Sequence, residues 1–146
     1  MNYVVDSSVA VKWFVREALH EQALELLDPE IRLTAPDLVI CELTNILWKK
    51  CIRKEITALQ GETIAQGITS YFVRLYPAAE LHERALEIGL ALGHPVYDCF
   101  FLACAEKSGS LLITDDRRLI DAVKGSDFEE ITVSLGNPDR RPAAPS

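Results

Sequence analysis

Several signatures of common enzyme and metal-protein classes are missing from this chain of 146 residues. It has no Gly-rich phosphate loop, no His-x-x-x-His pair and no Ser–His–Asp order. The three histidines are scattered, and we interpret His94, which precedes Pro95, as a turn residue. No Cys-x-x-Cys pair occurs among the four cysteines, so we expect free thiols rather than a zinc site or a disulfide framework.

Long apolar runs and an excess of positive charge are missing as well. No apolar run approaches the ~20 residues of a membrane span, and the opening MNYVVDSSVAVKWF lacks the basic region of a signal peptide. Together with free thiols, this predicts a cytoplasmic protein without a membrane partner. The net charge of −7 argues against a protein held on nucleic acid by bulk charge. It does not exclude a nuclease, because bound metal would offset part of an acidic site.

Apolar sequence is present in the amount that one packed domain needs, with 49% hydrophobic and 25% charged residues. Helical patterns alternate with short strand-like runs at residues 3–5, 31–34, 76–79, 111–114 and within 128–133. This alternation predicts an α/β fold with a central, mostly parallel sheet covered on both faces. We expect a single domain over residues 1–135. Residues 136–146, rich in proline and small residues, are expected to form a flexible tail.

Local signals predict where several helices begin and end. We expect Pro36 to open a long helix from its first turn and Asp115 to cap a short one. Thr57 is expected to cap a helix that runs to about Arg74. Gly93 is a plausible stop for the helix before it.

Four carboxylates stand where structure alone does not readily account for them: Asp6, Glu42, Asp98 and Asp116. Asp6 and Asp116 follow strand-like runs, and parallel sheets place their sites at the carboxyl ends of strands. Glu42 and Asp98 lie on otherwise apolar helix faces. A carboxylate removed from water is costly unless something positive compensates it. Together the four predict a site for Mg²⁺ or Mn²⁺ that activates water on a phosphodiester.

Each acid also has an ordinary structural explanation. Asp6 suits a helix cap, Glu42 an ion pair with a nearby Lys or Arg, and Asp98 the dipole of a first helical turn. Asp115 and Asp116 are adjacent, and the sequence does not decide which one caps the helix and which one points into the site.

Polar and basic residues close to the acids in sequence are candidate supporting groups. Asn45, one turn after the helical Glu, and Thr114, at the end of a strand, could orient a carboxylate or a ligand. Lys12, Arg117 and Arg118 could contact phosphates of a nucleic acid.

Three segments, in order, resemble the PIN-domain nucleases of the VapC toxin type: VVDSSVAVKWF, APDLVICELTNILWK and YDCFFLACAEKSGSLLITDDRRL. The match spans nearly the whole chain. The resemblance implies a three-layer α/β/α PIN-like fold around a parallel sheet. It places the family's four acids at Asp6, Glu42, Asp98 and Asp116. The family's small polar residue after the first acid falls on Ser7 or Ser8.

The resemblance also implies a function. PIN nucleases of this type resemble Mg²⁺- or Mn²⁺-dependent ribonucleases that hydrolyse RNA phosphodiester bonds, usually as the toxin of a two-gene toxin–antitoxin pair. A homodimer and a small antitoxin protein are the implied partners. Two other interpretations stay open, namely a PIN-fold nuclease without an antitoxin and a non-catalytic RNA-binding module. A receiver-like phosphoacceptor domain would need paired acids at the first strand, which are not evident.

Overall fold

A single parallel sheet forms the centre of the computed structural model, which describes residues 1–137. Its five strands lie in the order β3-β2-β1-β4-β5, and each neighbouring pair is parallel. The strands are β1 (Asn2–Val5), β2 (Arg32–Pro36), β3 (Arg74–Tyr76), β4 (Leu111–Thr114) and β5 (Thr132–Ser134). The sheet confirms the predicted α/β class with parallel strands.

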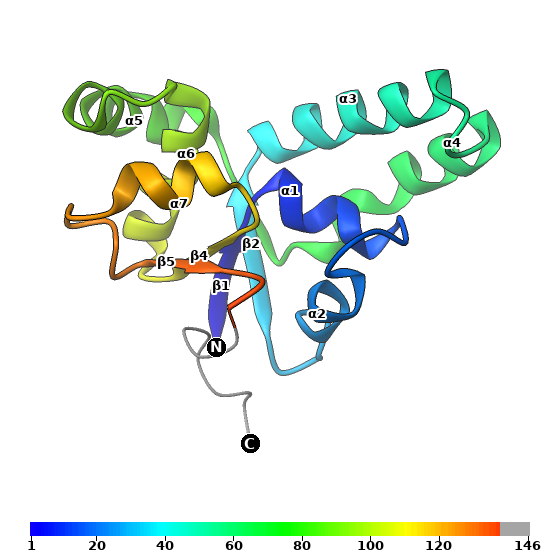
Figure 1. Ribbon diagram of the computed structural model, residues 1–146, viewed down its shortest axis with the longest axis horizontal. Helices are drawn as coiled ribbons and strands as arrows, with labels where there is room; N and C mark the ends of the chain where they lie inside the picture. Colours follow the sequence, from blue (N-terminus) through cyan, green and yellow to red (C-terminus); the bar gives the residue numbers. More distant parts are fainter. Residues whose placement is uncertain (138–146) are drawn as a thin grey trace.

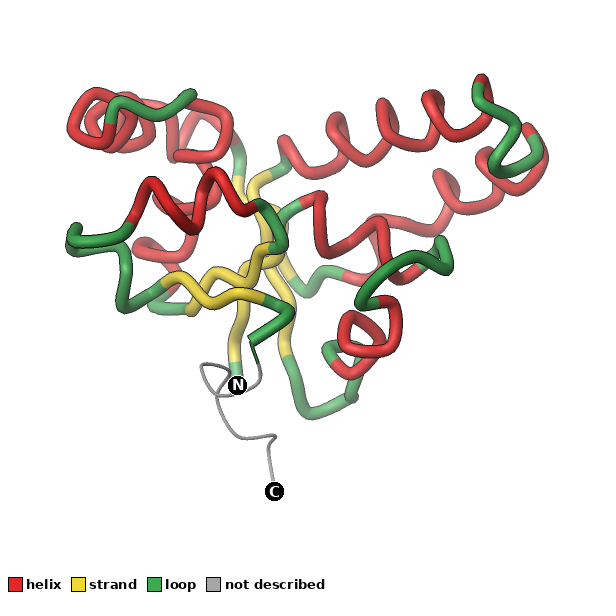
Figure 2. The backbone as a smooth tube through the Cα atoms, in the orientation of Figure 1, coloured by secondary structure: helices red, strands yellow, loops and turns green. Residues whose placement is uncertain are grey.

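Helices cover the sheet on both sides (Figures 1 and 2). The first group comprises α1 (Ser7–Ala10), η1 (Val11–Trp13), α2 (His20–Glu25), α3 (Leu38–Ile52), α4 (Ala58–Gly67) and η2 (Ile68–Tyr71). The second comprises α5 (Ala78–Leu92), α6 (Val96–Ser108) and α7 (Arg117–Val123). Figure 1 shows α1–α4 on one side of the sheet and α5–α7 on the other. This arrangement is the predicted three-layer α/β/α fold, and it follows from the right-handed crossovers that join parallel strands.

The core is built where β1, β4 and α6 meet. Val4, Val5 and Leu112 are fully buried in the two central strands, and Phe101 and Leu102 of α6 are buried against the sheet. Because both faces of the sheet are covered, these strands are continuous apolar runs rather than alternating ones. Within residues 1–137, no single helix is long and apolar enough to cross a membrane. The four cysteines are free thiols.

Several predicted boundaries were wrong. Pro36 does not open α3; it is the last residue of β2, and its neighbour Asp37 is the N-cap of α3. The helix capped by Thr57 ends at Gly67 and continues only as the 3₁₀ helix η2, so it does not reach Arg74. The strand expected at residues 76–79 is β3, and it begins earlier because Leu75 pairs with Ala35 of β2. Most of the expected tail, residues 138–146, lies outside the described residues.

The sheet order places a crevice between β1 and β4. From β1 the chain moves outward to β2 and β3, then returns to β4 on the other side of β1. In open parallel sheets, ligands bind beyond the carboxyl ends of the strands at such a reversal point. Asp6 follows β1 and Thr114 ends β4, so the two segments that border this crevice carry candidate site residues.

Candidate active site

Asp6 is the most buried of the four acids, with an exposed fraction of 6%. Its Oδ1 accepts hydrogen bonds from Ser8 Oγ at 2.6 Å and from the backbone N–H of Val9 at 3.2 Å. Its Oδ2 accepts from the hydroxyl of Thr114, which ties the end of β1 to the end of β4. The pKa of Asp6 is raised to about 6, mainly by burial and to a smaller extent by the negative charge of Asp98, while the three hydrogen bonds oppose the shift.

Glu42 lies on α3 and is half-buried. Ser7 Oγ donates to its Oε1 at 3.2 Å, which links α1 to α3. Burial raises the pKa of Glu42 to about 7, and the charges of Asp6 and Asp98 add to the increase. Within residues 1–137, no Lys or Arg lies within salt-bridge distance of Glu42, so the ion-pair explanation of this residue is not met.

Asp98 lies in the first turn of α6 with its side chain 30% exposed. His94 Nε2 lies 2.7 Å from Asp98 Oδ2, and the His94 side chain is only 9% exposed. Sequence reasoning missed this contact because it treated His94 as a turn residue. Its spacing of four residues from Asp98 was the signal that could have revealed it. The contact fixes Oδ2 of Asp98, while Oδ1 accepts no hydrogen bond from another residue within 1–137.

The loop between β4 and α7 separates the roles of the adjacent acids Asp115 and Asp116. Asp116 is the N-cap of α7, since its Oδ1 accepts from the backbone N–H of Arg118 at 2.9 Å. The prediction that Asp115 caps this helix was therefore wrong. Asp115 Oδ2 instead lies 3.2 Å from Lys12 Nζ. The backbone N–H of Asp116 donates to Thr114 Oγ1 at 3.0 Å, which connects Asp116 to Asp6 through one hydroxyl.

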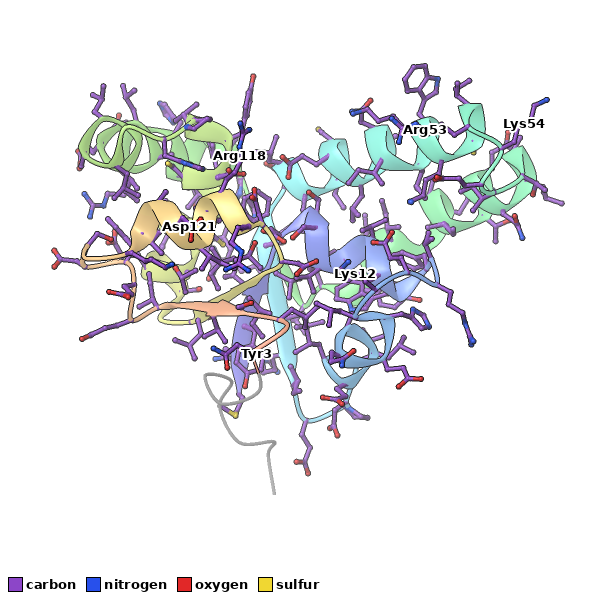
Figure 3. The ribbon with its side chains drawn as sticks, viewed as in Figure 1. Tyr3, Lys12, Arg53, Lys54, Arg118 and Asp121 are labelled. Atoms are coloured by element: carbon purple, nitrogen blue, oxygen red, sulfur yellow. The ribbon has the colours of Figure 1, made fainter. Side chains whose placement is uncertain are left out.

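The structure separates the candidate basic residues by exposure. Lys12 is buried and directed to Glu17 and Asp115, both at 3.2 Å, so its ammonium is committed to carboxylates rather than offered to a phosphate. Arg117 and Arg118 are exposed on α7. Figure 3 shows Lys12 near the centre of the molecule and Arg118 on α7, whereas Arg53 and Lys54 lie at the far end of α3.

The acids converge without forming a finished set of ligands. Asp98 is close enough for its charge to raise the pKa of Asp6, and the charges of Asp6 and Asp98 raise the pKa of Glu42. Asp116 is linked to Asp6 by its backbone N–H through the Thr114 hydroxyl. Among the described residues, no three His, Cys, Asp or Glu side chains are already arranged as a metal site. Asn45 is exposed, and the hydrogen bonds of residues 1–137 do not include one between Asn45 and Glu42.

The donor chemistry fits a divalent cation. Carboxylate oxygens are the ligands that Mg²⁺ and Mn²⁺ prefer, and a cation would relieve the repulsion and desolvation that raise the pKa of Asp6 and Glu42. No Lys or Arg within residues 1–137 already supplies that charge to either carboxylate. The residues present are thus suited to hold such an ion.

Comparisons with known proteins agree with this geometry. The family model described as PIN domain matches residues 3–125. Ribonuclease VapC3 from Pyrobaculum aerophilum is 31% identical over 83% of this chain and 94% of its own length. The crystal structure of PAE2754 from the same organism has a TM-score of 0.63 at 25% identity, covering 86% of this chain and 82% of that one. A toxin–antitoxin complex from Klebsiella pneumoniae shares the fold, with a TM-score of 0.62 at 16% identity, and covers 91% and 97%. The chain belongs to the PIN-domain family.

Proposed function

We propose that this protein is a metal-dependent endoribonuclease that hydrolyses RNA phosphodiester bonds and acts as the toxin of a toxin–antitoxin pair. The observation that carries the proposal is the group of Asp6, Glu42 and Asp98. Asp6 and Glu42 are partly or fully removed from water beside the charge of Asp98, which raises the pKa of both, and none of the three has a Lys or Arg counterion among the described residues. The name of a relative that matches 83% of the chain, a ribonuclease, supports RNA as the substrate.

Asp6, Glu42, Asp98 and Asp116 would hold Mg²⁺ or Mn²⁺. When bound, the ion supplies an activated water and compensates the negative charge that develops on the phosphate. The protein's own groups position these ligands. Ser8 and Thr114 fix the two oxygens of Asp6, and His94 fixes one oxygen of Asp98.

Glu42 is suited either to bind a metal or to orient the attacking water. Its pKa of about 7 lies near neutral pH, where a carboxylate both accepts and releases a proton readily. Ser7 holds Oε1 and thereby orients the carboxylate, so that Oε2 can orient the attacking water and take its proton. In-line attack on phosphorus then requires that the RNA strand lies across the crevice between β1 and β4.

The proposed partners are a small antitoxin protein and a second copy of this chain, in the cytoplasm. The antitoxin is supported by the fold shared with a toxin–antitoxin complex and by large apolar side chains that α3 and α4 expose. These are Trp48, Ile52 and Leu59, which are 59%, 64% and 72% exposed. The α3–α4 pair extends away from the sheet, as Figure 1 shows.

The proposal is tested by replacing Asp98 with Asn, which keeps its size but removes its charge. Purified antitoxin-free protein is incubated with total cellular RNA in Mg²⁺, in Mn²⁺ and in chelator. We expect discrete RNA fragments with either metal and none in chelator. In Asp98→Asn the cleavage rate should fall by more than the roughly 10- to 100-fold that follows removal of a group that only supports a metal ligand. Asp127→Asn, an exposed acid in the turn before β5, is the matched control and should cleave like wild type.

Two results would reject the assignment. Wild-type cleavage rates in metal-purified Asp98→Asn would remove Asp98 from the site. A folded wild-type protein that binds RNA but yields no fragments with either metal would favour the non-catalytic RNA-binding module.

A further inference from the structure

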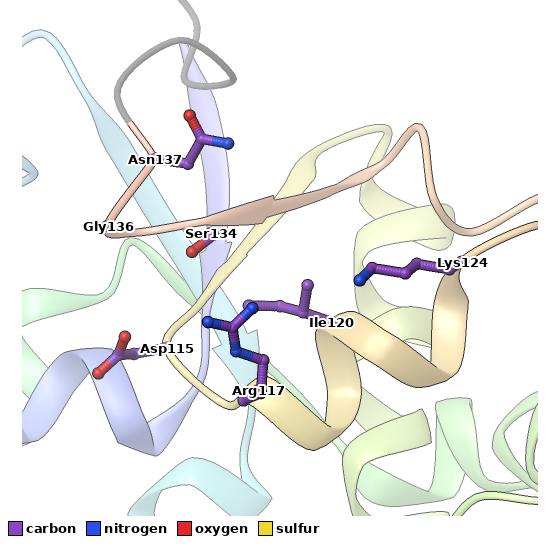
Figure 4. Close-up of a pocket in the computed structure, with 7 residues that line it drawn as sticks. All are labelled: Asp115, Arg117, Ile120, Lys124, Ser134, Gly136 and Asn137. Carbon is purple, nitrogen blue, oxygen red and sulfur yellow. The ribbon is translucent and has the colours of Figure 1, made fainter.

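A polar pocket lies beside α7 and the end of β5, and Asp115 from the loop after β4 lines it. It has a volume of about 440 Å³ and is lined by Asp115, Arg117, Ile120, Lys124, Ser134 and Asn137, among others. Figure 4 shows it between α7 and the segment that follows β5. Its size suits a small ligand or part of a larger one, and Ile120 is the only large apolar side chain among these residues. The pocket therefore favours a polar occupant.

The charges of the pocket are positive on balance. The side chains of Arg117 and Lys124 project into the same space (Figure 4). Asp115 is offset by the ammonium of Lys12 at 3.2 Å. Lys124 contacts Asp121 at 3.0 Å, but both side chains are more than half exposed, and such pairs contribute little. No carboxylate within residues 1–137 lies within salt-bridge distance of Arg117. A cationic pocket stands out in a protein of net charge −7.

The pocket and the acids share one loop. The backbone N–H of Asp115 donates at 3.0 Å to Ser8 Oγ, which in turn donates to Asp6. On the other wall, the backbone N–H of Leu135 donates to the carbonyl oxygen of Thr114 at 2.9 Å, which holds the segment after β5 against the end of β4. The loop that follows β4 thus contacts the acids on one side and lines the pocket on the other.

We propose that this pocket is a subsite for the RNA strand, in which Arg117 and Lys124 bind a backbone phosphate next to the one that is cleaved. The inference rests on the proposed ribonuclease function and adds the path of its substrate. A guanidinium presents paired donors to phosphate oxygens, an ammonium adds charge, and the Ser134 hydroxyl offers a polar contact to ribose. An acidic protein segment would meet the same cations, but continuity with the acids favours RNA.

The test measures RNA binding separately from cleavage. Binding of a short single-stranded RNA of mixed sequence is followed by fluorescence anisotropy over a range of salt, in Mg²⁺ and in an Asp98→Asn background. Each lost phosphate contact should reduce the slope of log K against log salt by about 0.7, so Arg117→Ala with Lys124→Ala should reduce it by about 1.4. Lys107→Ala removes an exposed charge from the last turn of α6, which precedes the start of β4 rather than its carboxyl end, and should leave the slope unchanged.

RNA cleavage, measured in proteins that keep Asp98, distinguishes the subsite proposal from the nuclease proposal. If wild type cleaves RNA but the Arg117/Lys124 double variant keeps full affinity and slope, the subsite is wrong and the nuclease stands. An equal loss in Lys107→Ala would also overturn the subsite, because it would show a general effect of charge. If the double variant loses RNA affinity although wild type cleaves nothing, the pocket binds RNA and the nuclease assignment fails. Unchanged thermal unfolding of each variant confirms that it is folded.

Discussion

Asp6 shows that a structural role and a site role can fall on the same residue. It does cap α1, because Oδ1 accepts from the backbone N–H of Val9. Capping does not explain the second oxygen, which accepts from Thr114 across the crevice, nor the exposed fraction of 6%. An ordinary cap would keep its carboxylate in water, where ionisation costs nothing extra. The burial of the Asp6 carboxylate is therefore the feature that indicates a bound cation.

His94 is expected to position Asp98 rather than to bind metal itself. In His94→Ala, Asp98 loses the partner that fixes Oδ2, so its carboxylate samples more orientations. We expect Mg²⁺ affinity and cleavage rate to fall by about 10- to 100-fold, with partial recovery in His94→Gln, which can donate to the same oxygen. Metal titration by calorimetry and a cleavage assay measure the two effects. His82→Ala, an exposed histidine of α5, should behave like wild type. Equal metal affinity in wild type and His94→Ala would contradict the positioning role.

At the scale of elements, the ion pair between Lys12 and Asp115 joins η1 to the loop before α7. Lys12 is 7% exposed, whereas Asp115 and Glu17 are each 32% exposed. Removing the lysine leaves Asp115 without a cationic partner among the described residues, although Glu17 keeps Lys50 at 3.5 Å. Removing Asp115 leaves Lys12 paired with Glu17. The two substitutions are therefore not equivalent, although each breaks the same contact.

A double-mutant cycle measures this difference. We expect Lys12→Met to lower the free energy of unfolding by on the order of 2 kcal/mol and Asp115→Asn by less than about 1 kcal/mol. The double variant should be more stable than the sum of the two losses predicts, because both single changes break the same Lys12–Asp115 contact and the sum counts its loss twice. Urea unfolding provides the values. Strictly additive losses in unfolding free energy would show that Lys12 and Asp115 are not coupled. The exposed pair Lys124–Asp121 is the control, and its two losses are expected to be nearly additive.

Elements with strong local signals were predictable from the sequence, and elements fixed by distant contacts were not. The strand Leu111–Thr114 and the helix Val96–Ser108 followed from apolar runs bounded by Gly109. The start of β3 depends on pairing with β2, which lies about forty residues away, and no local pattern encodes that register. In the same way, Pro36 is compatible with both the first turn of a helix and the end of a strand, and its pairing with Tyr76 of β3 determines that it ends β2.

The candidate acids were predictable for the same reason, because a carboxylate on an apolar helix face is visible in the sequence, as Glu42 and Asp98 show. Ser7 and Thr114 were candidates as well, but the sequence did not show which acid each one contacts. The contact of His94 with Asp98 was missed, since a histidine before a proline is typical of a turn. Lys12 resembled a surface cation until the fold buried it against Asp115.

At the scale of the whole molecule, the arrangement of charge predicts how stability depends on pH and metal. The folded-state pKa is about 6 for Asp6 and about 7 for Glu42, above their ordinary values of 3.8 and 4.5. The folded protein thus holds these protons to a higher pH than the unfolded chain does. The stabilisation from this difference is complete below the ordinary values and is lost as pH rises through about 6 and 7.

We therefore expect metal-free protein to lose, from Asp6, on the order of 2 kcal/mol of unfolding free energy between about pH 4 and pH 8. Asp6→Asn should flatten this part of the profile, whereas Asp127→Asn should not, because that acid is exposed. Mg²⁺ should restore the loss and stabilise far more at about pH 8 than at about pH 5, since its ligands must be deprotonated. Urea unfolding in chelator and in Mg²⁺ across this range gives both curves. A metal effect that is the same at both ends of the range would mean that the cation binds away from Asp6 and Glu42.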